Sequence, residues 1–118
     1  MDPIISGEAF KTVLGKKIKM LRELKQIGQV ELARALGYKS TGTISLIENG
    51  KKGMKVSSIL KASTFFKIHP AVLLSPLEVD KEDLEMFSDL MKLMERRKKE
   101  PDKTRPYFEA IRKLLEPT

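Results

Sequence analysis

Apolar residues recur every three or four positions along most of the chain, which is the spacing of a helix with one buried face. This pattern covers about residues 8–25 and then 29–36, where Gly37 is expected to cap the helix end. Shorter stretches follow at about 43–48, 57–66 and 70–74. No segment alternates as a strand does. The pattern predicts an all-α fold with five helices in residues 1–76.

Two further helices are predicted in residues 77–118. Asp80 is expected to cap the first, which runs to about residue 98, and Pro101 interrupts the pattern before Thr104, a candidate cap for the second. Each helix has an apolar stripe, formed by Leu84, Phe87, Leu90, Met91 and Met94 in the first and by Tyr107, Phe108, Ile111, Leu114 and Leu115 in the second. We therefore expect a head of residues 1–76 and a C-terminal helical hairpin of residues 77–118.

These ten apolar residues need a surface to cover them, because a two-helix hairpin buries little area by itself. That surface is the head, a second copy of the chain or a different protein. The apolar pattern by itself leaves all three open.

Positive charge is concentrated in the head. Residues 1–76 contain 13 Lys and Arg against 5 Asp and Glu, whereas residues 77–118 contain 10 against 11. Such segregation is typical of a polyanion-binding head joined to a neutral accessory segment. A lysine-rich solvated surface would have the same balance, so charge alone leaves both interpretations open.

Several classes of function are disfavoured by what the sequence lacks. The chain has no Cys and a single His, His69, for which a helix-entry role is favoured. It shows neither a nucleophile triad, nor metal-ligand spacing, nor a glycine-rich phosphate loop. We therefore expect no enzyme, metal or cofactor. No apolar run approaches the roughly 20 residues of a membrane span, and no secretion signal is evident, so a cytoplasmic protein is expected.

The two short helices at about 29–36 and 43–48 are joined by a tight turn, an arrangement typical of a helix-turn-helix. In that motif the second helix enters the major groove of DNA, which is about 12 Å wide. Small or polar side chains on its outer side let it approach the bases closely. The residues expected to contact bases from this helix, at about 41–49, are Thr41, Gly42, Thr43, Ser45 and Leu46.

The head resembles the Xre family of helix-turn-helix regulators, which includes the lambda-type repressors and Cro proteins. The residues that carry the resemblance are Leu14-Gly15-Lys16-Lys17-Ile18, Leu21-Arg22, Gln29-Val30-Glu31-Leu32-Ala33, Leu36-Gly37 and Ile44-Ser45-Leu46-Ile47-Glu48-Asn49-Gly50. The resemblance implies a five-helix head that binds a palindromic operator as a two-fold dimer. The tail is similar to the helical oligomerisation tails of SinR-like regulators. This similarity favours self-association and implies that the ten apolar residues of the two tail helices are dimerisation contacts.

The resemblance also implies roles for individual residues. Gln29 corresponds to a glutamine that holds a DNA phosphate, and Asn49 and the lysines after it correspond to a second phosphate clamp. Arg22 and Glu48 correspond to a structural salt bridge between the first helix and the recognition helix. The full set of expected phosphate contacts is Gln29, Asn49, Lys17, Lys39, Lys51 and Lys52.

Two features depart from the family pattern. Gly28 stands where a Ser or Thr cap is usual, and the stretch 37–44 is one residue longer than its commonest version. The recognition helix also lacks Arg, so specificity is expected to rest partly on DNA shape or on lysines of the following loop.

From the sequence we expect a dimeric, sequence-specific DNA-binding regulator that acts as a repressor. The alternative is an antitoxin-like or anti-regulator module whose C-terminal helices bind a regulatory protein partner.

Overall fold

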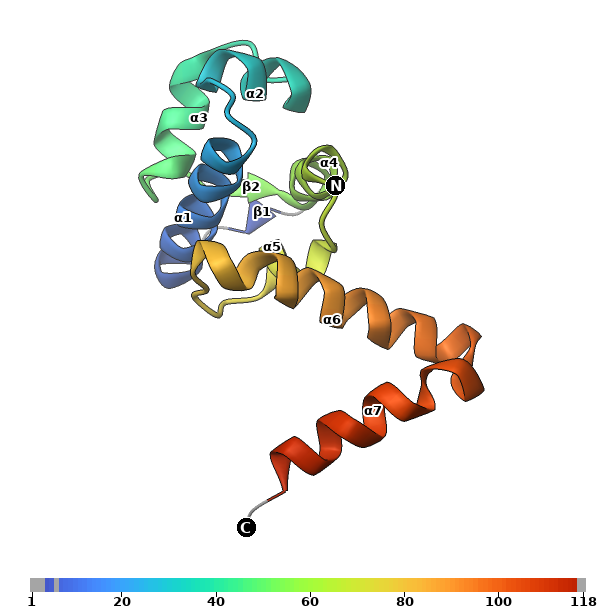
Figure 1. Cartoon of the computed structure of the whole chain (residues 1–118). Coiled ribbons are helices and arrows are strands. Elements are labelled where there is room, and N and C mark those ends of the chain that lie inside the picture. Colours follow the sequence, from blue (N-terminus) through green and yellow to red (C-terminus); the bar gives the residue numbers. More distant parts are fainter. Residues whose placement is uncertain (1–3, 6, 117–118) are drawn as a thin grey trace.

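The computed structural model describes residues 4–5 and 7–116, and within them the chain forms seven helices and one pair of very short strands (Figure 1). The head contains α1 (Glu8–Leu24), α2 (Gln29–Leu36), α3 (Thr41–Glu48), α4 (Val56–Phe66) and α5 (Pro70–Leu74). The tail contains α6 (Lys81–Lys99) and α7 (Pro101–Leu115). The expected five-helix head followed by two C-terminal helices is confirmed.

The two strands are an addition that the sequence pattern did not predict. β1 (Ile4–Ile5) pairs antiparallel with β2 (Met54–Lys55), with Ile5 opposite Met54. Two residues are too few to show an alternating pattern. The pairing joins the N-terminal segment to the loop that follows α3.

A single apolar core joins all five head helices and extends into the tail. Its fully buried members include Ile18 of α1, Leu32 of α2, Ile44 of α3, Ile59 of α4 and Leu73 of α5. Leu84 of α6 has an exposed fraction of 0% and packs in the same core. Its expected role as a dimerisation contact is therefore wrong, because no partner can reach it.

A hydrogen bond also joins the first half of α6 to the residue that precedes α5. The His69 amide donates to Ser88 Oγ over 2.8 Å, and Ser88 is buried. The His69 side chain caps α5, because its Nδ1 accepts from the Ala71 amide at 3.0 Å. The expected helix-entry role of this histidine is confirmed, and α6 leaves the head in a fixed direction.

The apolar pattern placed the start of two helices too late. α3 begins at Thr41, in agreement with the range of about 41–49 expected for the recognition helix but before the apolar stretch at about 43–48, because Ser40 caps it by accepting from the Gly42 amide at 3.1 Å. The last helix begins at Pro101, and Thr104 lies inside it. Thr104 Oγ1 donates to the Glu100 carbonyl over 3.0 Å, so this hydroxyl bonds back into its own helix and does not cap it.

Candidate nucleic-acid interface

The turn between α2 and α3 is defined by a cap on each side. Gly37 ends α2 with a φ of 80°, a left-handed conformation that favours glycine, and Tyr38 donates its amide to the Ala33 carbonyl over 2.8 Å. Ser40 caps α3 on the other side. Only Tyr38 and Lys39 lie between the two caps, so the Ser40 cap fixes Thr41 as the first residue of α3.

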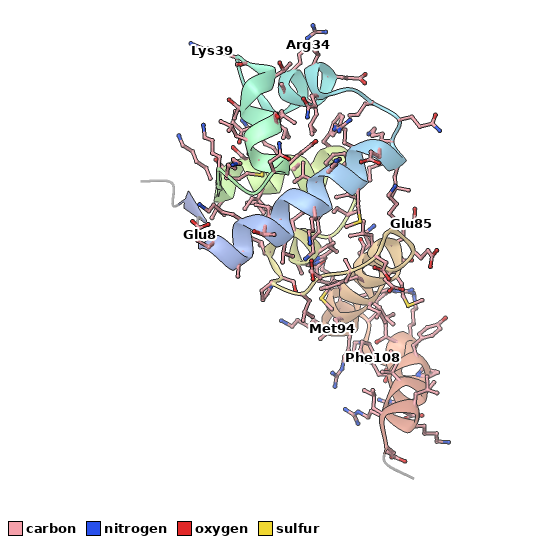
Figure 2. All side chains as sticks on the ribbon, turned by 90° about the vertical axis from the view of Figure 1, so that its left-hand side faces the viewer. Glu8, Arg34, Lys39, Glu85, Met94 and Phe108 are labelled. Carbon is pink, nitrogen blue, oxygen red and sulfur yellow. The ribbon has the colours of Figure 1, made fainter. Side chains whose placement is uncertain are left out.

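α3 presents one face to the core and the other to solvent. Ile44 and Ile47 are buried against the head. Thr41 and Gly42 are exposed, Thr43 and Ser45 are half-buried, and Leu46 is 46% exposed. Figure 2 shows α1 lying between α3 and the tail helices, with Lys39 and Arg34 at one end of the molecule and Phe108 near the other. The tail therefore leaves the outer face of α3 open.

The inner side of α3 lies in direct contact with α1. A Cβ placed on Gly15 would stand 2.2 Å from the Ile47 carbonyl oxygen and 3.0 Å from that of Glu48. Because real Cβ atoms do not approach so closely, any side chain at position 15 would push the C-terminal end of α3 outward.

Arg22 and Glu48 hold the same crossing by a two-bonded salt bridge. Arg22 Nε donates to Glu48 Oε2 over 2.6 Å and its Nη2 to Oε1 over 3.0 Å. The Glu48 carboxylate is almost fully buried, and its hydrogen bond to Arg22 raises the pKa of Arg22 above the ordinary value. Arg22 Nη1 also donates to the Ile27 carbonyl, so this one side chain connects α1, the segment before α2 and α3.

The two amides expected at the phosphates lie at the ends of the motif. Gln29 is the first residue of α2, and its Nε2 donates to Glu48 Oε1 over 3.1 Å. Asn49 follows α3, and its Nδ2 donates to the Ser45 carbonyl over 2.9 Å. An amide nitrogen has two hydrogens, so Gln29 keeps one for a further acceptor. Asn49 Nδ2 also donates to Ser45 Oγ over 3.4 Å, a long bond that a phosphate oxygen could replace.

Comparison with known proteins identifies the motif that α2 and α3 form. A family model described as helix-turn-helix matches residues 18–73, a range that begins within α1 and ends within α5. Residues 18–73 are a helix-turn-helix domain of the Xre type. The chain is thus a DNA-binding transcription regulator.

One solved structure is also similar to the regulator, the restriction-modification controller protein C.AhdI from Aeromonas hydrophila. The two are 27% identical with a TM-score of 0.48, and the match covers 52% of this chain and 92% of the other. No curated protein matches the regulator.

Lys17 is placed where it cannot contact DNA, so its expected role as a phosphate ligand is wrong. It is 1% exposed, and its Nζ donates to the Val72 carbonyl over 2.7 Å and to that of Ser75 over 2.9 Å. Burial lowers its pKa to about 8. The regulator therefore uses this lysine to hold the end of α5. The sequence contained the signal, because position 17 falls on the apolar face between Leu14 and Leu21.

The other expected phosphate lysines, Lys39, Lys51 and Lys52, are all exposed. Lys52 also lines a hollow of about 590 Å³ beside the turn. Two more lysines, Lys55 and Lys61, line the same hollow. Lys61 was not among the expected contacts, because in the sequence a lone lysine on α4 is indistinguishable from a solvated one. The hollow extends the positive surface from the turn to the start of α4.

The tail of the regulator leaves part of its apolar surface uncovered. Leu90, Met94, Tyr107, Leu114 and Leu115 are exposed. Phe87 packs partly against the core with the Lys17 Nζ 5.9 Å from its ring centre, and Met91 and Ile111 are half-buried. Phe108 lies under the Arg97 guanidinium, 5.0 Å from the ring centre. Within residues 4–5 and 7–116, no helix is both long and apolar enough to span a bilayer.

Proposed function

We propose that the regulator binds a palindromic operator as a homodimer, inserts α3 into the major groove of each half-site and represses transcription. The observation that carries the proposal is the open outer face of α3, presented by a helix whose inner face is fixed to α1. Such a helix meets DNA without rearrangement, which reduces the ordering cost of binding.

The outer face of α3 suits close approach to base edges. Gly42 has no side chain, and the hydroxyls of Thr41, Thr43 and Ser45 both donate and accept hydrogen bonds. Leu46 offers an apolar contact to a thymine methyl group. Because this set has no bidentate Arg, Gln or Asn, we infer that it discriminates modestly and that DNA shape supplies the remaining specificity.

Phosphate contacts on both sides of α3 would hold it in register. The Gly28 side of α2 offers free backbone N–H groups beside Gln29, because Gly28 provides no side-chain cap. Asn49, Lys51 and Lys52 lie at the other end of the motif, and Lys39 lies in the turn. These contacts would add affinity for any sequence, with a strong dependence on salt.

The exposed apolar side chains of the tail support dimerisation. The proposed contacts are Phe87, Leu90, Met91, Met94, Tyr107, Phe108, Ile111, Leu114 and Leu115. A two-fold dimer would present two α3 helices to half-sites about one helical turn apart. The chain would act in the cytoplasm, where its operator lies.

The same uncovered surface also favours a second candidate function, binding of a different regulatory protein through the tail. The mass of the isolated chain in solution separates the two. A mass near twice 13.4 kDa supports the homodimer, and a monomer at all concentrations supports a heterologous partner.

Selection of bound sequences from a random duplex pool tests the proposed function. We expect an inverted repeat with half-site centres about 10 base pairs apart. Enrichment of a single unrepeated site, or of no sequence at all, would contradict binding as a two-fold dimer.

A further inference from the structure

The tail divides into an acidic and a basic half. Residues 77–91 contain six Asp and Glu against one Lys, a net charge of −5, whereas residues 92–116 contain nine Lys and Arg against five Asp and Glu, a net charge of +4. The first segment includes the first half of α6, and the second includes the end of α6 and all of α7. The near-zero total charge of the tail conceals this division.

Much of this charge has no counterpart within the chain. Glu82, Asp83, Glu85 and Asp89 form no ion pair with any other described residue, and neither do Lys98, Lys99, Arg112 and Lys113. Figure 2 shows Glu85 projecting away from the ribbon. Helix-dipole stabilisation accounts for Glu82 and Asp83 in the first turn of α6, but it does not reach Asp89 in the middle of the helix.

An uncovered apolar stripe lies beside these charges. Met86, Leu90 and Met94 follow one another at intervals of four residues and therefore share one face of α6. They are 61%, 42% and 51% exposed. This face differs from the one that packs on the head, which carries Leu84 and Ser88. On α7, Leu114 and Leu115 are exposed as well.

We propose that the acidic first half of α6 binds the basic distal part of the tail of a second copy, with the two tails running in opposite directions. The proposal rests on the homodimer proposed above and specifies its orientation. In a two-fold interface every contact is made twice. Tails running in the same direction would place acid against acid and base against base, which is repulsive. Opposite directions place acid against base at both ends, with the apolar stripes between them.

Two sets of charge reversals test this orientation. The first variant carries Glu82→Lys, Glu85→Lys and Asp89→Lys, which lie on one exposed face of α6. The second carries Lys99→Glu, Arg105→Glu and Arg112→Glu at the basic end. Neither set touches the core. In a dimer of the first variant both contacts place base against base, and in a dimer of the second both place acid against acid. A heterodimer of the two variants places acid against base at both contacts.

We expect each variant alone to self-associate at least ten-fold more weakly than the wild type, and we expect the mixture to form a heterodimer. Sedimentation equilibrium measures both, and circular dichroism checks that each variant is folded. A matched control, Glu109→Lys with Glu116→Lys, also adds positive charge, but to the basic end, and should keep the wild-type dimer. Separate variants that dimerise normally, or a mixture that stays monomeric, would overturn the orientation.

The wild-type chain gives an independent measurement if a variant does not fold. Its dimer should dissociate at least ten-fold more readily as salt rises from low to high concentration, because the paired charges become screened. A dimer indifferent to salt overturns the charge-matched orientation and leaves the homodimer standing. A wild-type chain that is monomeric under all conditions overturns the homodimer itself.

Discussion

Gly15 of α1 lies directly against the Ile47 carbonyl of α3, at a distance that leaves no space for a side chain. Gly15→Ala should therefore separate the two helices or strain both, with a loss of about 1–3 kcal/mol in the free energy of unfolding. Urea denaturation measures this. Gly7→Ala is the matched control, since a Cβ there meets nothing within 4 Å. Equal stability of the two variants would contradict the tight crossing.

The Arg22–Glu48 pair should behave as one unit. Arg22→Met leaves the buried Glu48 carboxylate without its partner and should lower the free energy of unfolding by about 3 kcal/mol. Adding Glu48→Gln should recover part of that loss, because the uncompensated charge is removed. A double-mutant cycle by urea denaturation gives the coupling, and strictly additive losses would show that the pair is not coupled.

The lowered pKa of Lys17 predicts that the stability of the folded chain rises with pH in the alkaline range. Its pKa is about 8 in the folded chain against an ordinary value of 10.5, so between these values the unfolded chain binds more protons. The free energy of unfolding of the wild type, relative to Lys17→Met, should therefore rise from pH 8 to 10.5 and stay level below pH 7. If the free energy of unfolding of the two proteins changed with pH in parallel, Lys17 would not be a buried lysine with a lowered pKa.

Parts of the fold could be read from the sequence because they depend on local signals. Helical periodicity located the seven helices, and Gly37 marked a helix end by its φ requirement. Leu84 shows what was not local. It lies on the apolar stripe of α6, but only the packing of α6 on the head decides that its side chain is buried there. The charge of Lys17 obscured its position on the apolar face.

The register of the recognition helix shows the same limit. Either Ser40 or a later hydroxyl could have capped α3, and the choice depends on where Gly37 directs the chain. Thr104 shows the opposite outcome, because its position matches the cap pattern but its hydroxyl donates to the Glu100 carbonyl and lies inside α7. A β-pair of two residues on each strand, Ile4 with Lys55 and Ile5 with Met54, joins segments that are distant in the sequence and leaves no periodic signal at all.

Gln29 and Asn49 should contribute affinity without specificity. Replacing either by Ala should weaken binding to operator and to unrelated duplex by a similar factor, because phosphates are the same in every sequence. Binding titrations at several salt concentrations measure both. Lys17→Met should leave the salt dependence unchanged, whereas Lys51→Ala should reduce its slope by about one. A loss confined to the operator would contradict the assignment of both amides to phosphates.

Recognition of a specific operator requires that α3 is the element that contacts the bases. Selection from a random duplex pool, repeated with Leu46→Ala and with the control Leu60→Ala on the exposed side of α4, tests this in one measurement. We expect Leu46→Ala to relax the preference at one symmetric pair of positions while Leu60→Ala selects the wild-type sequence. The same selected sequence for all three proteins would contradict recognition by this face of α3.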